Sequence, residues 1–173
     1  MEYIPTAEEC IKILKDIGCS KNVISHCEAV RDIAVRIAEK TDADIKLVEA
    51  GALLHDIGRS KTHGINHAVE GVKIAKKLGL SKKIIRIIQT HIGAGIIKEE
   101  AKKLGLPSMD YLPETLEEKI VCHADSLIDN CKKQDIEKEV EKALINGYNE
   151  YAKRLVILHK ELSDIIGFDV NNI

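Results

Sequence analysis

The chain has 173 residues, of which 45% are hydrophobic and 31% are charged, and its formal net charge is −2. This length is enough for one globular domain whose hydrophobic core needs no disulfide or structural metal for support. The near-neutral charge excludes the strongly basic surface by which proteins bind nucleic acids or anionic membranes, although a small phosphate ligand needs only a local positive site.

The first third of the chain has the apolar spacing of helices. Thr6 is placed to cap a helix over residues 7–17, and Gly18 to end it. Ser20 is placed to cap a second helix, whose apolar residues recur with helical spacing. His26 falls on that apolar stripe, so we expect its side chain to face the interior.

The middle of the chain predicts three further helices and one irregular segment. Residues 93–114 mix a short helix with turns, which is typical of an insertion or a lid. The three helices are each preceded by a residue that can cap them: Asp44 before residues 45–58, Asn66 before 67–78, and Ser81 before 82–93.

The last third is also helical by its pattern. Thr115 and Glu118 have the spacing of a capping box for a helix over residues 116–130. A final helical stretch runs from about residue 135 to 165, contains Gly147, and ends before a tail that we expect to be frayed. With only three prolines and no alternating β-branched runs, the chain is predicted to be all-α and a single domain over residues 1–173.

No apolar run approaches the roughly 20 residues that a membrane-spanning helix needs, and the N-terminal residues lack the apolar core of a signal peptide. We therefore expect a cytoplasmic protein with no membrane partner. The five cysteines include no closely spaced pair, so reduced and mostly buried thiols are expected instead of disulfides or a zinc knuckle.

A few histidines and aspartates interrupt the buried faces of these predicted helices. A lone inward histidine is usually a satisfied core residue, and a lone aspartate is often a cap, so none of them is convincing by itself. Their convergence from separate helices is what favours a metal site, because a buried carboxylate is tolerable beside a cation. Imidazole with carboxylate suits iron, manganese, zinc or nickel better than calcium. The residues are His26, His55, Asp56, His91 and Asp125.

The order of these residues resembles the H…HD…D signature of the HD superfamily, and residues 55–58 match its HDIG variant. The likeness covers about residues 20–130, and the helices at about 135–165 are expected to pack on this core or to pair with a second copy in a homodimer. The resemblance implies an HD-domain helical bundle. It also implies that four residues bind a divalent metal: His26, His55, Asp56 and Asp125.

Some HD families add two histidines between the HD pair and the last aspartate, which lets the HD aspartate bridge two metals. Here the candidates are His67 and His91, with Asp56 as the bridge. His63 competes with His67, which is favoured because it begins a helix after a capping residue. The resemblance therefore implies one or two ions of iron, manganese, nickel, zinc or cobalt.

The pattern is most similar to small HD-domain hydrolases that cleave nucleotides or dinucleoside tetraphosphates. It implies a metal-dependent phosphohydrolase that cleaves a phosphoester or phosphoanhydride of a small, nucleotide-like substrate with a metal-bound hydroxide. Asp56 would orient the nucleophile, His63 would be the general acid, and Arg59 and Lys61 would hold the substrate phosphate, with Lys61 also assisting catalysis. The plainer interpretation of Arg59 and Lys61 is that they are solvated loop charges.

Two other functions fit the same ligand pattern. Some HD proteins with six such ligands are mixed-valent diiron oxygenases, and others are non-catalytic modules that bind nucleotides. Outside the ligand set, His123 lies two positions before Asp125 and is expected on the surface, pointing away from the site. Asp129 lies one turn after Asp125 and could line the edge of the pocket.

Overall fold

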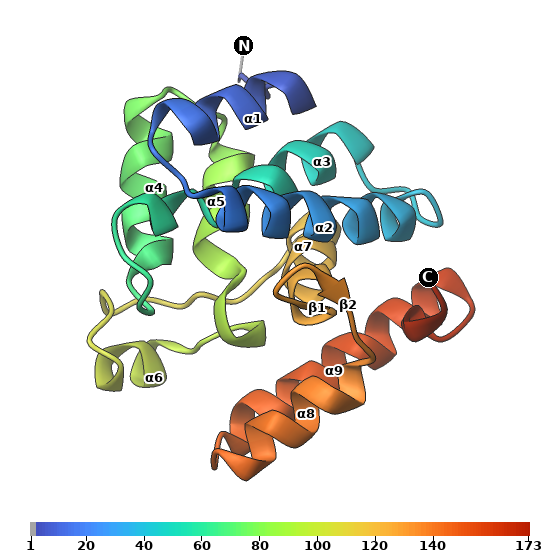
Figure 1. Cartoon of the computed structure of the whole chain (residues 1–173). Coiled ribbons are helices and arrows are strands. Elements are labelled where there is room, and N and C mark those ends of the chain that lie inside the picture. Colours follow the sequence, from blue (N-terminus) through green and yellow to red (C-terminus); the bar gives the residue numbers. More distant parts are fainter. Residues whose placement is uncertain (1–2) are drawn as a thin grey trace.

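The computed structural model describes residues 3–173, in which nine α-helices are joined by short turns and one small hairpin (Figure 1). The all-α class and the single domain are confirmed. No helix among these residues is long and apolar enough to cross a membrane. The elements are α1 (Ala7–Asp16), α2 (Lys21–Ala38), α3 (Ile45–Leu54), α4 (His67–Lys77), α5 (Lys82–Thr90), α6 (Lys98–Lys103), α7 (Leu116–Ser126), β1 (Ile128–Asp129), β2 (Lys132–Lys133), α8 (Ile136–Ile145) and α9 (Asn149–Ile166).

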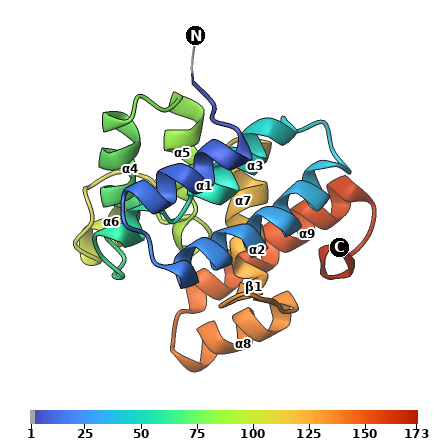
Figure 2. The same ribbon diagram turned by 45° about the horizontal axis from the view of Figure 1, so that its top comes forward.

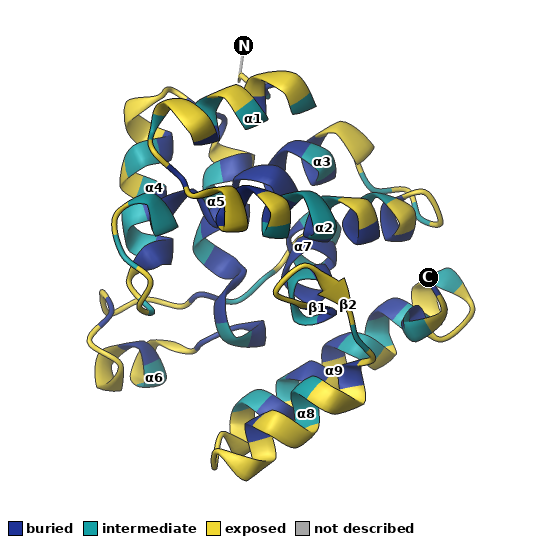
Figure 3. Ribbon diagram, viewed as in Figure 1, coloured by how far each residue is buried: buried dark blue, intermediate teal, exposed yellow. Residues whose placement is uncertain are grey.

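The helix α3 lies at the centre of the bundle and is buried along most of its length (Figure 3). Its second half has no charged residue, so it can pack on every side. Gly51 lets α5 approach closely, because a Cβ at this position would lie 2.5 Å from Cδ1 of Ile87. The helices α1, α2, α5 and α7 surround α3 with an aliphatic core.

The helices α8 and α9 form a hairpin along one side of this bundle (Figures 1 and 2). The contact is made by α9, which packs on α7 with three buried leucines: Leu155, Leu158 and Leu162. An ion pair of 2.6 Å between Nζ of Lys119 on α7 and a carboxylate oxygen of Glu161 on α9 also joins the two helices. These helices are therefore an integral part of the core.

The C-terminal helical stretch predicted over about residues 135–165 consists of α8 and α9, which are separated at Gly147, where φ is +77°. Two other expectations for this part of the chain were wrong. The tail is not frayed, because Val170 is fully buried and the Oδ1 of Asn171 accepts a hydrogen bond of 2.9 Å from the backbone N–H of Ile136. The helix predicted to reach residue 130 ends at Ser126 and is followed by the unpredicted β1–β2 hairpin.

One predicted capping box forms only in part, and one predicted side-chain cap does not form. Thr115 accepts a hydrogen bond from the backbone of Glu118, but the carboxylate of Glu118 does not return to Thr115. It accepts instead from the backbone of Glu114, at 3.0 Å, and from Arg86. Asn66 occupies the capping position of α4 and makes no side-chain hydrogen bond there. The expected caps at Thr6, Ser20, Asp44 and Ser81 are confirmed.

The irregular segment over residues 93–114 is packed and does not stand free. It contains α6 and a bridge between Ile96 and Tyr111. Tyr111 is buried in a small apolar cluster that also includes Ala68 of α4. Within residues 3–173, four cysteines are buried thiols, Cys131 is exposed, and none is paired with another.

Candidate metal centre

The carboxylate of Asp56 lies at the junction that follows α3 and faces four histidines. Its Oδ2 is 3.7 Å from Nε2 of His55 and 3.8 Å from Nε2 of His26. Its Oδ1 is 3.2 Å from Nε2 of His67 and 3.4 Å from Nε2 of His91. The two oxygens of one carboxylate therefore face two different pairs of imidazoles.

Asp125 of α7 completes the first of these two groups. Its Oδ1 is 2.9 Å from Nε2 of His26 and 3.5 Å from Nε2 of His55. The possible ligand atoms of His26, His55 and Asp125 all lie within 4.8 Å of one another, as do those of His55, Asp56 and His91. The structure thus brings together all six of the residues expected to bind metal.

Each of the four imidazoles is oriented by a backbone carbonyl. A carbonyl oxygen can only accept a hydrogen bond, so every Nδ1 carries a proton and every Nε2 is the ring nitrogen that faces the carboxylates. Such outer hydrogen bonds are the usual means of fixing a metal-binding nitrogen. The Nδ1 atoms donate from His26 to Asn130 at 2.7 Å, from His55 to Ala52 at 2.7 Å, from His67 to Gly64 at 2.8 Å, and from His91 to Ile88 at 2.8 Å.

These orientations leave polar atoms unsatisfied in a way that fits a divalent cation. The Nε2 atoms of His67 and His91 are 2.9 Å apart, a distance at which two neutral rings protonated at Nδ1 would set their lone pairs against each other. Nε2 of His55 and Oδ1 of Asp56 are buried and have no hydrogen-bond partner. Burying such groups unpaired is costly, and a shared cation would satisfy them. The donor set of imidazole nitrogens and carboxylate oxygens suits manganese, iron, cobalt, nickel or zinc.

The electrostatics of the cluster also favour a cation. Burial acts to raise the pKa of Asp56, but the charge of His55 and the nearby imidazoles of His67 and His91 outweigh it and hold the pKa well below its usual range. Burial also acts to raise the pKa of Asp125, but His55 and His26 outweigh it, so this pKa too lies below its usual range. Burial lowers the pKa of His91. Both carboxylates therefore stay ionised although they are enclosed, and together with Cys27 they hold the pKa of His55 well above its usual value against the effect of burial. A divalent cation beside Nε2 of His55 would take the place of that proton.

Gly58, the last residue of the HDIG sequence, explains how His67 reaches this cluster. A Cβ at position 58 would lie 1.8 Å from the carbonyl oxygen of His67 and 2.6 Å from the backbone nitrogen of Gly71. Only glycine lets the first turn of α4 pack directly on the turn that follows Asp56. The absence of a side chain at Gly58 therefore lets the imidazole of His67 lie next to the Asp56 carboxylate.

A cavity of about 700 Å³ opens beside the centre, and its lining includes His26, Asp56, Arg59 and His63. Nε of Arg59 donates to Oδ2 of Asp56 at 2.5 Å, and its Nη1 donates to the backbone carbonyl of His63 at 3.2 Å. His63 is exposed at this rim and lies outside the imidazole cluster. Lys61 is exposed and is not among the residues that line the cavity.

Sequence reasoning missed the part that the β1–β2 hairpin plays. Asn130, at its turn, has φ of +57° and supplies the carbonyl that orients His26. Asn130 and Cys131 also line the 700 Å³ cavity. The signal that could have found this turn is the Asp129–Asn130 pair, because both residue types favour turns and asparagine tolerates positive φ.

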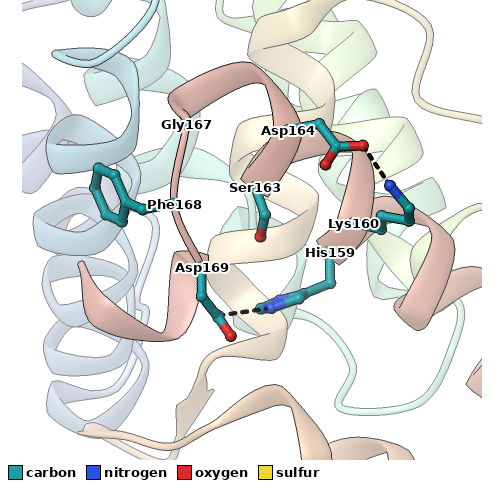
Figure 4. A pocket seen from close by; sticks show the side chains of 7 residues that line it. All are labelled: His159, Lys160, Ser163, Asp164, Gly167, Phe168 and Asp169. Atoms are coloured by element: carbon teal, nitrogen blue, oxygen red, sulfur yellow. Dashed lines mark hydrogen bonds and ion pairs between the residues drawn. The ribbon is translucent and has the colours of Figure 1, made fainter.

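His123 was predicted to lie on the surface, which is wrong. It is fully buried, and its Nε2 is 2.9 Å from Nδ1 of His159 on α9. Nε2 of His159 in turn donates to Oδ1 of Asp169 in the tail at 3.0 Å (Figure 4). His123 does point away from Asp125, as expected, but α9 covers that face of α7. Burial, and then the neighbouring His159, lower the pKa of His123 to about 3.

The HD domain family matches residues 23–129, which include every residue of the imidazole and carboxylate cluster. The chain belongs to the HD domain family. The resemblance seen in the H…HD…D order is thereby confirmed at the level of the superfamily.

Relatives of this HD chain differ in length and in name. An uncharacterized protein of Methanocaldococcus jannaschii is 47% identical over 167 residues, which are 92% of this chain and 98% of that protein. A protein of Thermoplasma volcanium named tRNA (cytidine(56)-2'-O)-methyltransferase is 46% identical over all 173 residues. The chain spans about half of that relative, 51% of its length.

A solved structure shares the fold. The HD domain of the Listeria monocytogenes phosphodiesterase PgpH, in complex with cyclic-di-AMP, has a TM-score of 0.57 and 18% sequence identity. The match covers 90% of this chain and 94% of that chain. At this level of identity the likeness establishes the HD fold and leaves the substrate of this chain to be argued from its own site.

Proposed function

We propose that this HD chain is a metal-dependent phosphohydrolase that cleaves a phosphoester or phosphoanhydride of a nucleotide-like molecule. The observation that carries the proposal is the Asp56 carboxylate, whose two oxygens face two separate pairs of imidazole nitrogens. His26, His55, Asp56 and Asp125 would hold a first ion of iron, manganese, nickel, zinc or cobalt. Asp56, His67 and His91 would hold a second. A divalent metal at such a site activates water and neutralises charge on phosphoryl oxygens.

The residues around the cluster supply the rest of the chemistry. Arg59 lies against Asp56 and lines the larger cavity, so its guanidinium can hold a phosphate oxygen by a charge-assisted hydrogen bond. His63 lines the rim of the same cavity, and in this proposal its imidazole would give a proton to the leaving oxygen. The exposed position of Lys61, outside the cavity lining, favours Arg59 over Lys61 as the phosphate ligand.

The comparisons support the reaction class and leave the substrate open. PgpH is a phosphodiesterase whose HD domain was solved with a cyclic dinucleotide, which favours a nucleotide-like phosphodiester or phosphoanhydride for this chain also. The methyltransferase named above is about twice as long, so the activity in its name belongs to a protein of which this chain resembles only one part. A dinucleoside tetraphosphate stays among the candidate substrates.

The test is metal-stimulated hydrolysis. Purified protein loaded in turn with manganese, iron, cobalt, nickel or zinc is assayed on p-nitrophenyl phosphate, AMP, cyclic-di-AMP and diadenosine tetraphosphate. We expect release of phosphate or nucleotide, and a loss of more than about a hundredfold in Asp56→Ala and Asp125→Ala. Asp42→Ala, a substitution at an exposed aspartate after α2, is the matched control and keeps its activity. Oxygen uptake without hydrolysis would contradict the proposal and indicate an oxygenase.

A further inference from the structure

A second cavity, of about 180 Å³, touches the same metal centre from the side of the C-terminal hairpin. His91 and Asp125 of the centre line it, together with Glu139 and Lys142 of α8 and Tyr151 of α9. It shares no lining residue with the 700 Å³ cavity. The β1–β2 hairpin lies between the two cavities, since Asp129 lines the smaller one and its neighbour Asn130 the larger one.

The C-terminal wall of this smaller cavity is held in place by hydrogen bonds. The Tyr151 hydroxyl donates to Oε1 of Glu139 at 3.1 Å. Gln134 donates from one Nε2 to Oε2 of Glu139 at 3.3 Å and to the backbone carbonyl of Ser126 at 3.2 Å. Burial, Glu139 and Asp125 raise the pKa of Tyr151, so its hydroxyl stays protonated. The wall therefore offers two fixed acceptors, the Glu139 carboxylate and the Tyr151 hydroxyl oxygen, because the one hydroxyl proton is used in the bond to Glu139.

A second set of contacts fixes α9 against the opposite edge of the cavity. Nη1 of Arg154 donates to Oε2 of Glu100 on α6 at 2.9 Å, and its Nε donates to the backbone carbonyl of Gly93 at 3.4 Å. Gly93 itself lines the cavity, two residues after His91. The hairpin and the metal centre are thus joined on both sides of this space.

The charges of the lining exclude an anionic group here. Asp125, Asp129 and Glu139 place three carboxylates around the space, against the one ammonium of Lys142, whose Nζ is 3.9 Å from Oε2 of Glu139. Even when Asp125 is engaged by a metal, two carboxylates face one cation. A phosphate would meet more repulsion than attraction, so it belongs beside Arg59 in the other cavity.

The size and the mixed donors and acceptors point to a small polar group. A volume of 180 Å³ is far below the ~300–1,000 Å³ of sites that enclose a whole ligand. Hydroxyl groups both donate and accept, which matches a wall that combines carboxylates with a phenol and an ammonium. The Glu139 carboxylate has lone pairs left for a hydroxyl beyond the bonds from Tyr151 and Gln134.

We propose that this cavity binds the hydroxyl-bearing sugar of the substrate, with Glu139 as its main acceptor and Tyr151 as the residue that holds the Glu139 carboxylate in place. The proposal rests on the proposed phosphohydrolase function and places the phosphate at the imidazole and carboxylate cluster. It assigns substrate selection to α8 and α9, which lie outside the residues 23–129 that match the HD domain family.

The test compares a ribonucleotide with one that lacks the sugar hydroxyls. Binding of AMP and of 2′,3′-dideoxy-AMP to the manganese-loaded full chain is measured by calorimetry, and hydrolysis of p-nitrophenyl phosphate, which has no sugar, is measured in parallel. We expect wild type to bind AMP at least about tenfold more tightly. Glu139→Gln and Tyr151→Phe should reduce that preference while p-nitrophenyl phosphate hydrolysis changes by less than about twofold. Glu141→Gln, an exposed glutamate on the same helix, is the control.

The two proposals fail differently in this experiment. Equal or undetectable binding of the two nucleotides, in a protein that hydrolyses p-nitrophenyl phosphate, overturns the sugar site and leaves the phosphohydrolase standing. A preference for AMP that survives Glu139→Gln also overturns it. A preference for AMP that Glu139→Gln abolishes, in a protein that hydrolyses no phosphate ester with any metal, supports the sugar site and overturns the phosphohydrolase.

Discussion

The HD core and the C-terminal hairpin approach the same metal centre by different means. In the core, backbone carbonyls orient four imidazoles around Asp56, so the site depends on where each helix begins and ends. The hairpin α8–α9 contributes side chains alone, held by their own hydrogen bonds and by a leucine contact with α7. The two regions thus differ in what fixes their polar groups: backbone carbonyls orient the candidate metal ligands of the core, and side-chain hydrogen bonds hold the residues of α8 and α9 that are proposed to select the substrate.

The largest effect is expected where the hairpin joins the core. Leu155→Ala removes a fully buried side chain between α9 and α7 and should lower the free energy of unfolding by about 3 kcal/mol. Val156→Ala, at the next position but 52% exposed, should cost less than about 1 kcal/mol. Urea unfolding followed by circular dichroism measures both. Equal and small losses would mean that the hairpin is an appendage and not part of the core.

A comparable loss of stability is expected from a substitution at Gly58, in the turn that follows Asp56. Gly58→Ala places a Cβ against the carbonyl of His67, so α4 must move away from Asp56. We expect a loss of about 2–3 kcal/mol in the free energy of unfolding, together with weaker binding of a second metal. Gly64→Ala is the matched control in the same loop, because its Cβ would be 3.8 Å from the nearest side chain. If the two variants are equally stable, the close approach of α4 does not hold His67 in place.

The buried His123 makes the joint between α7 and the hairpin sensitive to acid. Its pKa of about 3 in the folded protein is below the value of about 6.5 expected when unfolded. The unfolded chain therefore binds the extra proton between these values, so this contribution to stability is complete above pH 6.5 and is lost as the pH falls toward 3. Between pH 7 and pH 5 the resulting loss in the free energy of unfolding should be about 2 kcal/mol. The urea midpoint of wild type should fall over this range more than that of His123→Gln, and parallel curves would contradict the assignment.

The sequence pattern predicted which residues of the HD core face inward, but it did not predict the contacts that α8 and α9 make with that core. His26 and Asp125 were found because their spacing from apolar neighbours placed them on buried helix faces. His123 was misplaced because its burial depends on α9, which lies far away in sequence and has no local signature at α7. The β1–β2 hairpin was not predicted because strands of two residues are too short to show an alternating pattern.

The residues of the candidate site also include some that the sequence pattern predicted and some that only the folded structure brings to the site. His67 and His91 were predicted from their order after the HD pair, and the structure brings both to Oδ1 of Asp56. Lys61 was predicted from its place in the loop after Asp56, but the direction of a loop side chain depends on packing that a single sequence does not show. Glu139 and Tyr151 carry no motif, and only the folded hairpin places them beside Asp125.

The count of metal ions per chain tests the shared carboxylate most directly. Protein incubated with manganese and freed of excess metal is analysed by mass spectrometry of its metal content, with His67→Ala, His63→Ala and Asp56→Ala in parallel. We predict about two ions for wild type and for His63→Ala, about one for His67→Ala, and a near-complete loss for Asp56→Ala. Wild-type protein that retains no metal, or Asp56→Ala that retains as much as wild type, would contradict the account.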